Sequence, residues 1–390
     1  MRRVPGPAGD EVHAHARPCG RTADCADQTY ETYTKLLSRL ADEGVAADDL
    51  ATETLFLAAP VGGIDEILAA RRRAMAEAGL EGAGTALTVV GQAPCGDGAG
   101  AVEVSAMAFA SVSGAAARAD LVTAVAECRC KDCKGGFRAR RRRWDGRTVV
   151  HAANVYGSGD DLAAEAFAMF VEAERLLAAA GMDFGDVLRT WIYLRDIDRD
   201  YDALNRARRE FFASRGIERR PASTGVQGIP IAAEHDVAMS LFAARDAGRR
   251  GLETMTTPLL NEAWTYGADF SRGLRVEDGD TVSLIVSGTA SIDESGRSLH
   301  DGDLSAQVDR MLDNIATLLD AHGATFEDLA SAVTYVRCGR DADAVRRRLD
   351  AAGFRGFPIA VVEAPLCRPE LLCETEAVAS LKRSGGDESQ

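Results

Sequence analysis

One carboxylic acid near the end of the chain lies in surroundings that would suit proton transfer. Glu374 is part of an apolar stretch, 371–379, which predicts a β-strand after a turn-rich segment with prolines at 365 and 369. If that strand is buried, desolvation raises the pKa of the carboxyl group and makes it a candidate general acid at neutral pH. Because a strand alternates its faces, an outward-facing glutamate is the alternative.

The elements that would position this residue occur in two copies, at residues 148–246 and 255–382. Each copy reads as strand, helix, strand, helix and two strands, and its first helix is amphipathic. The segments GMDFGDVLRTWIYLRD and GATFEDLASAVTYVRC share Gly, Phe, Asp, Tyr and Arg at equal offsets. Counted from the proline that precedes the last strand pair, Val237 takes the position of Glu374. A carboxylate in only one copy favours chemistry over a framework role.

The predicted fold class is α+β, built from tandem β-α-β-α-β-β units in which two helices cover one face of a sheet. The other sheet faces would be buried against one another, and a pocket is expected at the seam between copies. The predicted parts are a disordered tail at 1–28, a degenerate N-terminal subdomain at 29–147 that lacks a second helix, and the two copies.

Composition narrows the range of partners. The chain has 390 residues, 46% of them hydrophobic, and a formal net charge of −15. An acidic protein repels nucleic acid and anionic membranes, so neither is an expected partner. An anionic substrate would need locally clustered arginines. The first residues show no apolar signal sequence, and no apolar run reaches membrane-spanning length, so we predict a cytoplasmic protein.

Among nine cysteines, three are close together: Cys128, Cys130 and Cys133. This spacing lacks the distant second pair of a structural zinc site, so a metal site and a reduced surface loop both remain open. The chain shows no nucleotide-binding loop, haem ligand set or dinucleotide-binding glycine pattern. We therefore predict no cofactor, and we assign no residue as a metal ligand.

Several motifs resemble the RidA/YjgF family: SGTASI at 287–292, the helix LSAQVDRMLDNIATLLDAHGATFEDL, and the ending PIAVVEAPL…LCETEAVA. The resemblance implies a chorismate-mutase-like fold, with three copies around an axis and ligand sites at their seams. RidA-type imine deaminases carry a carboxylate-binding arginine fifteen residues before the matching glutamate. Here that residue is Ile359, and its counterpart in the other copy is Ala222, which argues against a deaminase.

The tandem arrangement, with WIYLRDI, PASTG and CRPELLCETEA, resembles the chorismatase family. This resemblance implies that Glu374 protonates the enolpyruvyl methylene of chorismate and that pyruvate is released. Family members yield 3-hydroxybenzoate, 4-hydroxybenzoate or a dihydroxycyclohexadiene carboxylate. Cys367 resembles the hydroxybenzoate-forming branch and Ala290 the hydrolytic one, and we expect 3-hydroxybenzoate. A RidA-like imine deaminase and a non-catalytic small-molecule-binding protein are the alternatives.

Chorismate is a dianion, so binding requires cations or backbone donors. Arg195 and Arg368 are the candidate cations. Tyr193 is either a hydrogen-bond donor to the substrate or a core aromatic residue. Two polar, glycine-containing turns, able to present backbone N–H groups to a carboxylate, complete the predicted site: Ser223, Thr224 and Gly225, and Gly288, Thr289 and Ala290. The expected partner is one small molecule, and the protein is expected to be a monomer or a homotrimer.

Overall fold

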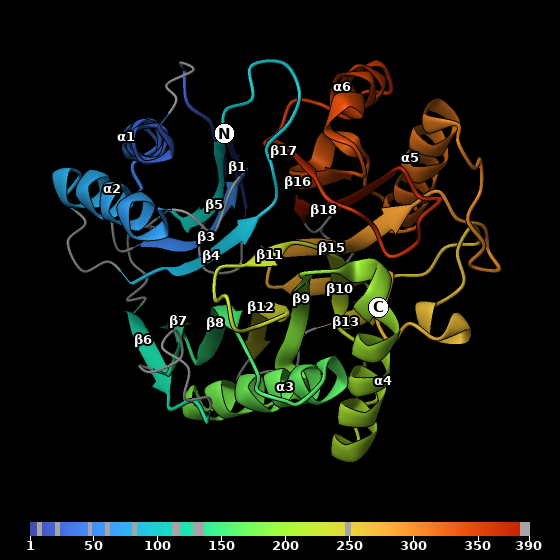
Figure 1. Ribbon diagram of the computed structural model, residues 1–390, viewed down its shortest axis with the longest axis horizontal. Helices are drawn as coiled ribbons and strands as arrows, with labels where there is room; N and C mark the ends of the chain where they lie inside the picture. Colours follow the sequence, from blue (N-terminus) through green and yellow to red (C-terminus); the bar gives the residue numbers. More distant parts are fainter. Residues whose placement is uncertain are drawn as a thin grey trace, which may run out of the picture.

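The computed structural model describes residues 1–5, 10–19, 24–45, 49–58, 63–79, 84–110, 118–127, 136–245 and 251–382. The strands of these residues form three six-stranded sheets. In Figure 1 the sheets are gathered at the centre of the molecule and the helices lie at its periphery, two for each sheet. The tandem α+β fold predicted from the sequence is confirmed.

Each unit consists of one sheet and its two helices. The first unit contains β1 (Arg2–Val4), β2 (Glu11–Ala16), α1 (Cys25–Asp42), β3 (Leu50–Leu57), α2 (Ile64–Glu77), β4 (Ala86–Gly91) and β5 (Val102–Phe109). The second contains β6 (Arg118–Ala124), β7 (Phe137–Trp144), β8 (Arg147–Val155), α3 (Leu162–Ala179), β9 (Val187–Leu194), α4 (Ile197–Arg215), β10 (Ala222–Gln227), β11 (Ile229–Pro230) and β12 (Val237–Arg245). The third contains β13 (Leu252–Thr254), β14 (Gly273–Asp278), β15 (Thr281–Ala290), α5 (Leu304–Asp320), β16 (Leu329–Val336), α6 (Ala342–Ala351), β17 (Ile359–Glu363) and β18 (Cys373–Lys382).

The three units share one strand order. It runs β2-β5-β3-β4 in the first, β8-β12-β9-β10 in the second and β15-β18-β16-β17 in the third. The short strand β11 crosses from the second unit and pairs with β4 of the first. The chain therefore holds three like units, and each seam brings together two of them.

The N-terminal part differs from its prediction. Residues 1–28, expected to be a disordered tail, contribute β1 and β2 to the first sheet and the start of α1. With α1 and α2 the first unit has both helices and is not degenerate in that respect. Strands β6 and β7 lie within residues 29–147, the predicted N-terminal subdomain, but they belong to the second sheet. These errors share a cause: β2 pairs with β5, far along the chain, and local composition does not reveal such a partner.

The internal repeat has a local structural reason. Gly181 and Gly323 follow α3 and α5 with φ angles of 81° and 71°, a backbone conformation that glycine adopts at no steric cost. In each copy a capping box then closes a short 3-10 turn before the next strand, because the Asp186 or Asp328 side chain accepts the N–H three residues earlier. The shared Gly and Asp thus set the path from helix to strand.

Helix α5 forms for reasons visible in its sequence. Its buried apolar residues recur at helical spacing, and Asp303 caps its first turn by accepting the N–H of Ala306 at 3.0 Å. The apolar face packs on the third sheet. The helix holds that sheet from outside and leaves the inner face free to meet the other units.

One position in the last strand of each unit lies opposite an aromatic residue of the neighbouring strand. The pairs are Glu103 with Phe56, Ala238 with Tyr193, and Glu374 with Tyr335. Ala238, and not Val237, is therefore the counterpart of Glu374 in the second unit. The first unit also has a glutamate there, so the prediction that the acid occurs in one copy holds only for the two copies recognised in the sequence.

The first unit also repeats a cysteine of the third. Cys95 and Cys367 each follow the end of their penultimate strand, β4 or β17, by four residues. Glu103 is fully buried and its Oε2 lies 2.9 Å from His15 Nε2. The equivalent thiol and acid therefore occur twice in the fold, in different surroundings.

Candidate active site

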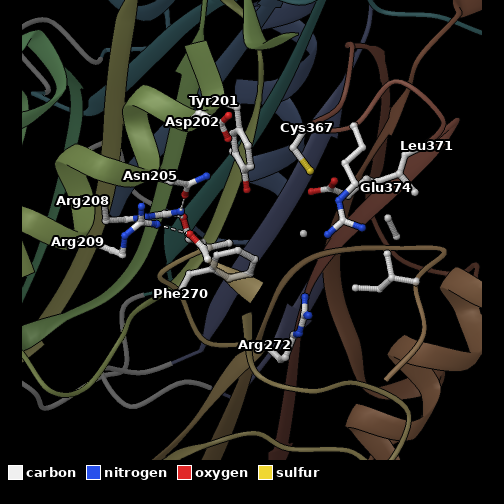
Figure 2. Close-up of a pocket in the computed structure, with 18 of the residues that line it drawn as sticks. Tyr201, Asp202, Asn205, Arg208, Arg209, Phe270, Arg272, Cys367, Leu371 and Glu374 are labelled. Atoms are coloured by element: carbon white, nitrogen blue, oxygen red, sulfur yellow. Dashed lines mark hydrogen bonds between the residues drawn. The ribbon is translucent and has the colours of Figure 1, made fainter. Parts of the chain in front are cut away.

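A cavity of about 480 Å³ lies at the seam between the second and third units. Figure 2 shows side chains of α4 on one side and the segment with Cys367 and Glu374 on the other. A volume of this size is typical of small-molecule sites. A second cavity, of about 190 Å³, is lined by strands of all three units and is mainly apolar.

Glu374 lies in β18 and reaches the wall of the larger cavity. The residue is 5% exposed, and burial raises the pKa of its carboxyl group to about 8, with a further contribution from the negative charge of Glu376. The desolvated orientation is therefore the one adopted. At neutral pH this group carries a proton and can donate it.

The space for the carboxyl group depends on a glycine. The pairing of β15 with β18 shifts register between Val286 and Thr289, which is a β-bulge. A Cβ atom at Gly288 would lie 1.9 Å from Oε1 of Glu374. The backbone N–H of Gly288 donates to Oγ1 of Thr224 in the second unit, at 3.0 Å. The bulge and the missing side chain together leave room for the acid.

The loop between β17 and β18 brings Cys367 and Arg368 to the cavity. Burial, with the neighbouring Glu374, raises the pKa of the Cys367 thiol to about 12, so the sulfur is uncharged at neutral pH. Arg368 donates to the Gly296 carbonyl at 2.5 Å and to Ser298 Oγ at 3.2 Å. Arg337, at the end of β16, donates to three carbonyls of the same loop and fixes its path.

Helix α4 supplies polar side chains from the second unit. Tyr201, Asn205 and Arg208, at spacing i, i+4 and i+7, share one helix face and line the cavity. Arg208 is 3% exposed and donates to Asn205 Oδ1 at 2.5 Å and Ser223 Oγ at 3.4 Å. Its Nε has no acceptor among the described residues. Burial lowers the pKa of this guanidinium, so an anion at its side would be favourable.

Phe270 lies between two arginines of the cavity. Its ring centroid is 5.5 Å from the guanidinium carbon of Arg208 and 5.7 Å from that of Arg272. Both distances are within cation–π range. Arg272 comes from the third unit, directly before β14, and its Nε donates to the Asn261 carbonyl at 2.9 Å. The ring separates two positively charged side chains that come from different units (Figure 2).

Most predicted site residues meet at this seam. The cavity is lined by Glu374, Cys367, Arg368, Gly288, Ala290, Ser223 and Gly225. Thr224 and Thr289 are buried behind the wall. The predicted backbone donors are already used at two positions: Ser223 N–H donates to Ser287 Oγ at 2.9 Å, and Gly288 N–H to Thr224 Oγ1. These two N–H groups are therefore not available to a substrate carboxylate.

Arg195 and Tyr193 do not line the cavity. Arg195 pairs with Asp236 at 2.9 Å and donates to carbonyls of the loop before β12, the role that Arg337 has in the third unit. Arg195 therefore fixes the path of this loop and does not reach the cavity. Tyr193 is buried in the apolar core shared with the third unit, which bears out the alternative of a core aromatic residue.

The sequence analysis missed the arginines and the aromatic residue that shape the seam. Arg208 could have been noticed, because with Tyr201 and Asn205 it forms a polar stripe on an otherwise amphipathic helix. Phe270 and Arg272 lie in an irregular segment before β14 and carry no local signal. Only the packing of two units brings these side chains together.

Two further features to consider are a metal site and a membrane-spanning helix. Among these residues no three His, Cys, Asp or Glu side chains are grouped to hold a metal ion. Cys128, Cys130 and Cys133 lie outside the described residues. Within the described part of the chain, no helix combines the length and apolarity that crossing a membrane requires.

Comparison with known proteins gives consistent matches. The family model described as endoribonuclease L-PSP, which represents the RidA/YjgF family, matches residues 148–244. A 3-hydroxybenzoate synthase of Streptomyces hygroscopicus is 30% identical over 237 residues, 54% of this chain and 68% of the relative. A chorismatase of Streptomyces rapamycinicus is 29% identical over 229 residues, 51% of this chain and 65% of the relative. A chorismatase crystal structure has a TM-score of 0.62 at 19% identity, covering 97% of this chain and 99% of its own.

Three units share one strand order, and the second of them matches the RidA/YjgF family model. One seam between units holds a buried acid and several arginines, which is typical of an enzyme site. The similarity to the Streptomyces hygroscopicus protein extends over two thirds of that relative, and the crystallised chorismatase has the same fold over nearly its whole length. The chain belongs to the chorismatase family.

Proposed function

We propose that this enzyme converts chorismate by removing its enolpyruvyl group as pyruvate, with Glu374 as the general acid. One observation carries the proposal: a carboxyl group that keeps its proton at neutral pH lies in a cavity surrounded by arginines. The names of two relatives, 3-hydroxybenzoate synthase and chorismatase, support the choice of substrate.

The charges of the cavity suit a dianion. Arg208 and Arg272 flank Phe270, and Arg272 and Arg368 both favour a negative charge at the position of Glu374. We assign the binding of one carboxylate to Arg208, which lines the cavity from the second unit, and leave Arg272, on the other side of the ring, for the second negative charge. Carboxylate binding at Arg208 leaves the rest of the substrate to extend toward Glu374. The apolar central cavity offers no such set of arginines.

The proposed chemistry begins with proton transfer from the Glu374 carboxyl to the methylene carbon of the enolpyruvyl ether. The double bond supplies the electron pair for the new C–H bond, and an oxocarbenium ion forms next to the ether oxygen. When water attacks this cation, the hemiketal that forms breaks the bond between the ether oxygen and the former enolpyruvyl carbon, which releases pyruvate and leaves the ether oxygen on the ring. When an internal hydroxyl oxygen instead attacks the ring carbon, the bond between that carbon and the ether oxygen breaks, and the ether oxygen leaves as the keto oxygen of pyruvate. The conjugate base of Glu374 then recovers a proton, which restores the acid.

The attacking oxygen decides the ring product. Water gives the dihydroxycyclohexadiene carboxylate and pyruvate, whereas a displacement within the substrate gives 3-hydroxybenzoate and pyruvate without consuming water. We propose 3-hydroxybenzoate. The uncharged thiol of Cys367 lines the cavity close to Glu374, where it can exclude water. Ala290 lines the same cavity, opposite Glu374 in the pairing of β15 with β18.

Replacing Cys367 by Ala should redirect part of the turnover toward the diene diol, because the smaller side chain admits water near the cation. Mass analysis of the ring products measures this fraction, because the diene diol is heavier than 3-hydroxybenzoate by the elements of one water molecule. Cys373→Ala is the matched control, since that thiol is buried in the third unit's core and does not line the cavity. An unchanged product in the Cys367 variant would end this role for the thiol.

Incubation with chorismate tests the proposal itself. Pyruvate should appear in equal amount to the chorismate consumed, and one ring product should accompany it. Because Glu374 acts in its protonated form and its pKa is raised to about 8, kcat/KM should be lost as the pH rises through that value. Chorismate that persists unchanged with the folded enzyme would refute the proposed function.

A further inference from the structure

A second glutamate lies two residues after Glu374 on the same face of β18 and lines the central cavity. Glu376 is buried, and its carboxylate accepts three hydrogen bonds: from Arg189 Nη2 at 2.8 Å, Trp191 Nε1 at 2.6 Å and Tyr335 OH at 3.2 Å. Arginine and tryptophan side chains can only donate. One of these donors reaches each oxygen of Glu376. Of the two glutamates on this strand face, Glu376 is thus the one in a buried ion pair, with Arg189.

Arg189 connects this pair to the wall of the site. It lies in β9 of the second unit and, besides Glu376, donates to Thr224 Oγ1 at 2.5 Å and to the Val286 carbonyl at 3.3 Å. Thr224 Oγ1 in turn accepts the N–H of Gly288. The guanidinium therefore holds both sides of the bulge that makes room for Glu374. The bonds cross the seam between two units.

The groups that face Glu374 come from every element around it. They are Glu376 on its own strand, Arg189 of β9, Arg272 before β14, Tyr335 of β16, Cys367 and Arg368 of the preceding loop, and Cys373. Of the charged groups that act most on Glu374, Glu376 is the acidic one and raises its pKa, whereas the arginines lower it. Of the two members of the buried ion pair, Glu376 therefore has a larger electrostatic effect on the pKa of Glu374 than Arg189 has.

We propose that Glu376, fixed by Arg189, Trp191 and Tyr335, is a positioning residue whose negative charge adds to burial in holding the proton on the neighbouring Glu374. The role of this device in turnover rests on the proposed function; the protonation of Glu374 does not. Without Glu376, burial alone would oppose the effect of the surrounding arginines, and a smaller fraction of Glu374 would be protonated at neutral pH.

Infrared titration of the whole enzyme tests this without substrate. The carboxylic-acid band of Glu374 is identified by its absence in Glu374→Gln and followed with pH. In Glu376→Gln, which keeps the shape but removes the charge, the titration midpoint should fall by about one pH unit or more. In Glu376→Asp, which keeps the charge, it should stay within about half of that shift. A midpoint unchanged or raised in Glu376→Gln would overturn the proposal.

The single variant leaves Arg189 buried without its partner, which can prevent folding. The double variant Arg189→Gln with Glu376→Gln removes both charges and leaves two amides side by side. Because Glu376 acts more strongly on Glu374 than Arg189 does, the midpoint should still fall, by less than in the single variant. A midpoint equal to that of the wild type or higher would again contradict the inference. A wild type that titrates as stated but releases no pyruvate would refute the proposed function alone.

Discussion

Replacing Glu374 by Gln should reduce kcat for pyruvate release from chorismate by about 10²- to 10⁴-fold, the contribution typical of a positioned general acid. The amide has nearly the same shape, but it has no acidic proton to give. Substrate binding should change far less, because the arginines that we assign to the carboxylates remain. A coupled assay for pyruvate over a range of chorismate concentrations separates the two parameters. Activity within tenfold of the wild type would remove Glu374 from the mechanism.

The same variant has a second readout, in stability. The native state holds the Glu374 proton up to a pH of about 8, whereas an unfolded glutamate releases it near a pH of about 4.3. Between these values the native state binds more protons than the unfolded state, so this group makes the protein less stable as the pH rises. Glu374→Gln should therefore melt at a higher temperature than the wild type at pH 8, and the gain should shrink toward pH 4. A variant with lost activity and lowered melting temperature would instead indicate damage to the fold.

Replacing Arg208 by Gln should lower kcat/KM for chorismate by about two orders of magnitude, chiefly through KM, since a buried charged contact is worth about 2–5 kcal/mol. The amide can still reach Asn205 but provides no charge for the substrate. Arg208→Lys should recover only part of the loss, because an ammonium group lacks the planar pair of donors.

Arg199 provides the matched control on the same helix. It is exposed, pairs with Asp200 and Asp236, and does not line the cavity. Arg199→Gln should leave both kinetic parameters nearly unchanged. If Arg208→Gln behaves in the same way, the carboxylate of the substrate binds elsewhere in the cavity and the binding mode proposed above is wrong.

Local patterns were sufficient for much of the fold. Each of the two copies contains the predicted alternation of strand, helix, strand, helix and two strands, because apolar periodicity, caps and the terminal glycines are all local. Glu374 was found in the same way, from the apolar residues around it. The N-terminal strands were not, since β2 is stabilised by a partner strand that its own sequence does not show.

The site was only half predictable for a related reason. Arg195 shares its offset in the repeat with Arg337, and the structure shows that both hold the loop before the last strand. Repetition at these two positions indicated a framework role and not a site. Arg208, Phe270 and Arg272, in contrast, become a binding surface only when two units pack together. Sequence periodicity within one unit contains no information on that packing.

The cysteine–glutamate pair of the first unit bears on how such chains should be interpreted. Cys95 and Glu103 repeat the strand positions of Cys367 and Glu374, yet Glu103 is bonded to His15 and lines neither cavity, while Arg346 of the third unit donates to the Cys95 carbonyl. A search for this residue pair would thus mark two places in one polypeptide. Fusion into a single chain lets each junction diverge independently, which three identical subunits cannot do. Within the described residues, one junction combines the acid with a cavity and arginines. The other pair, Cys95 and Glu103, has a structural role.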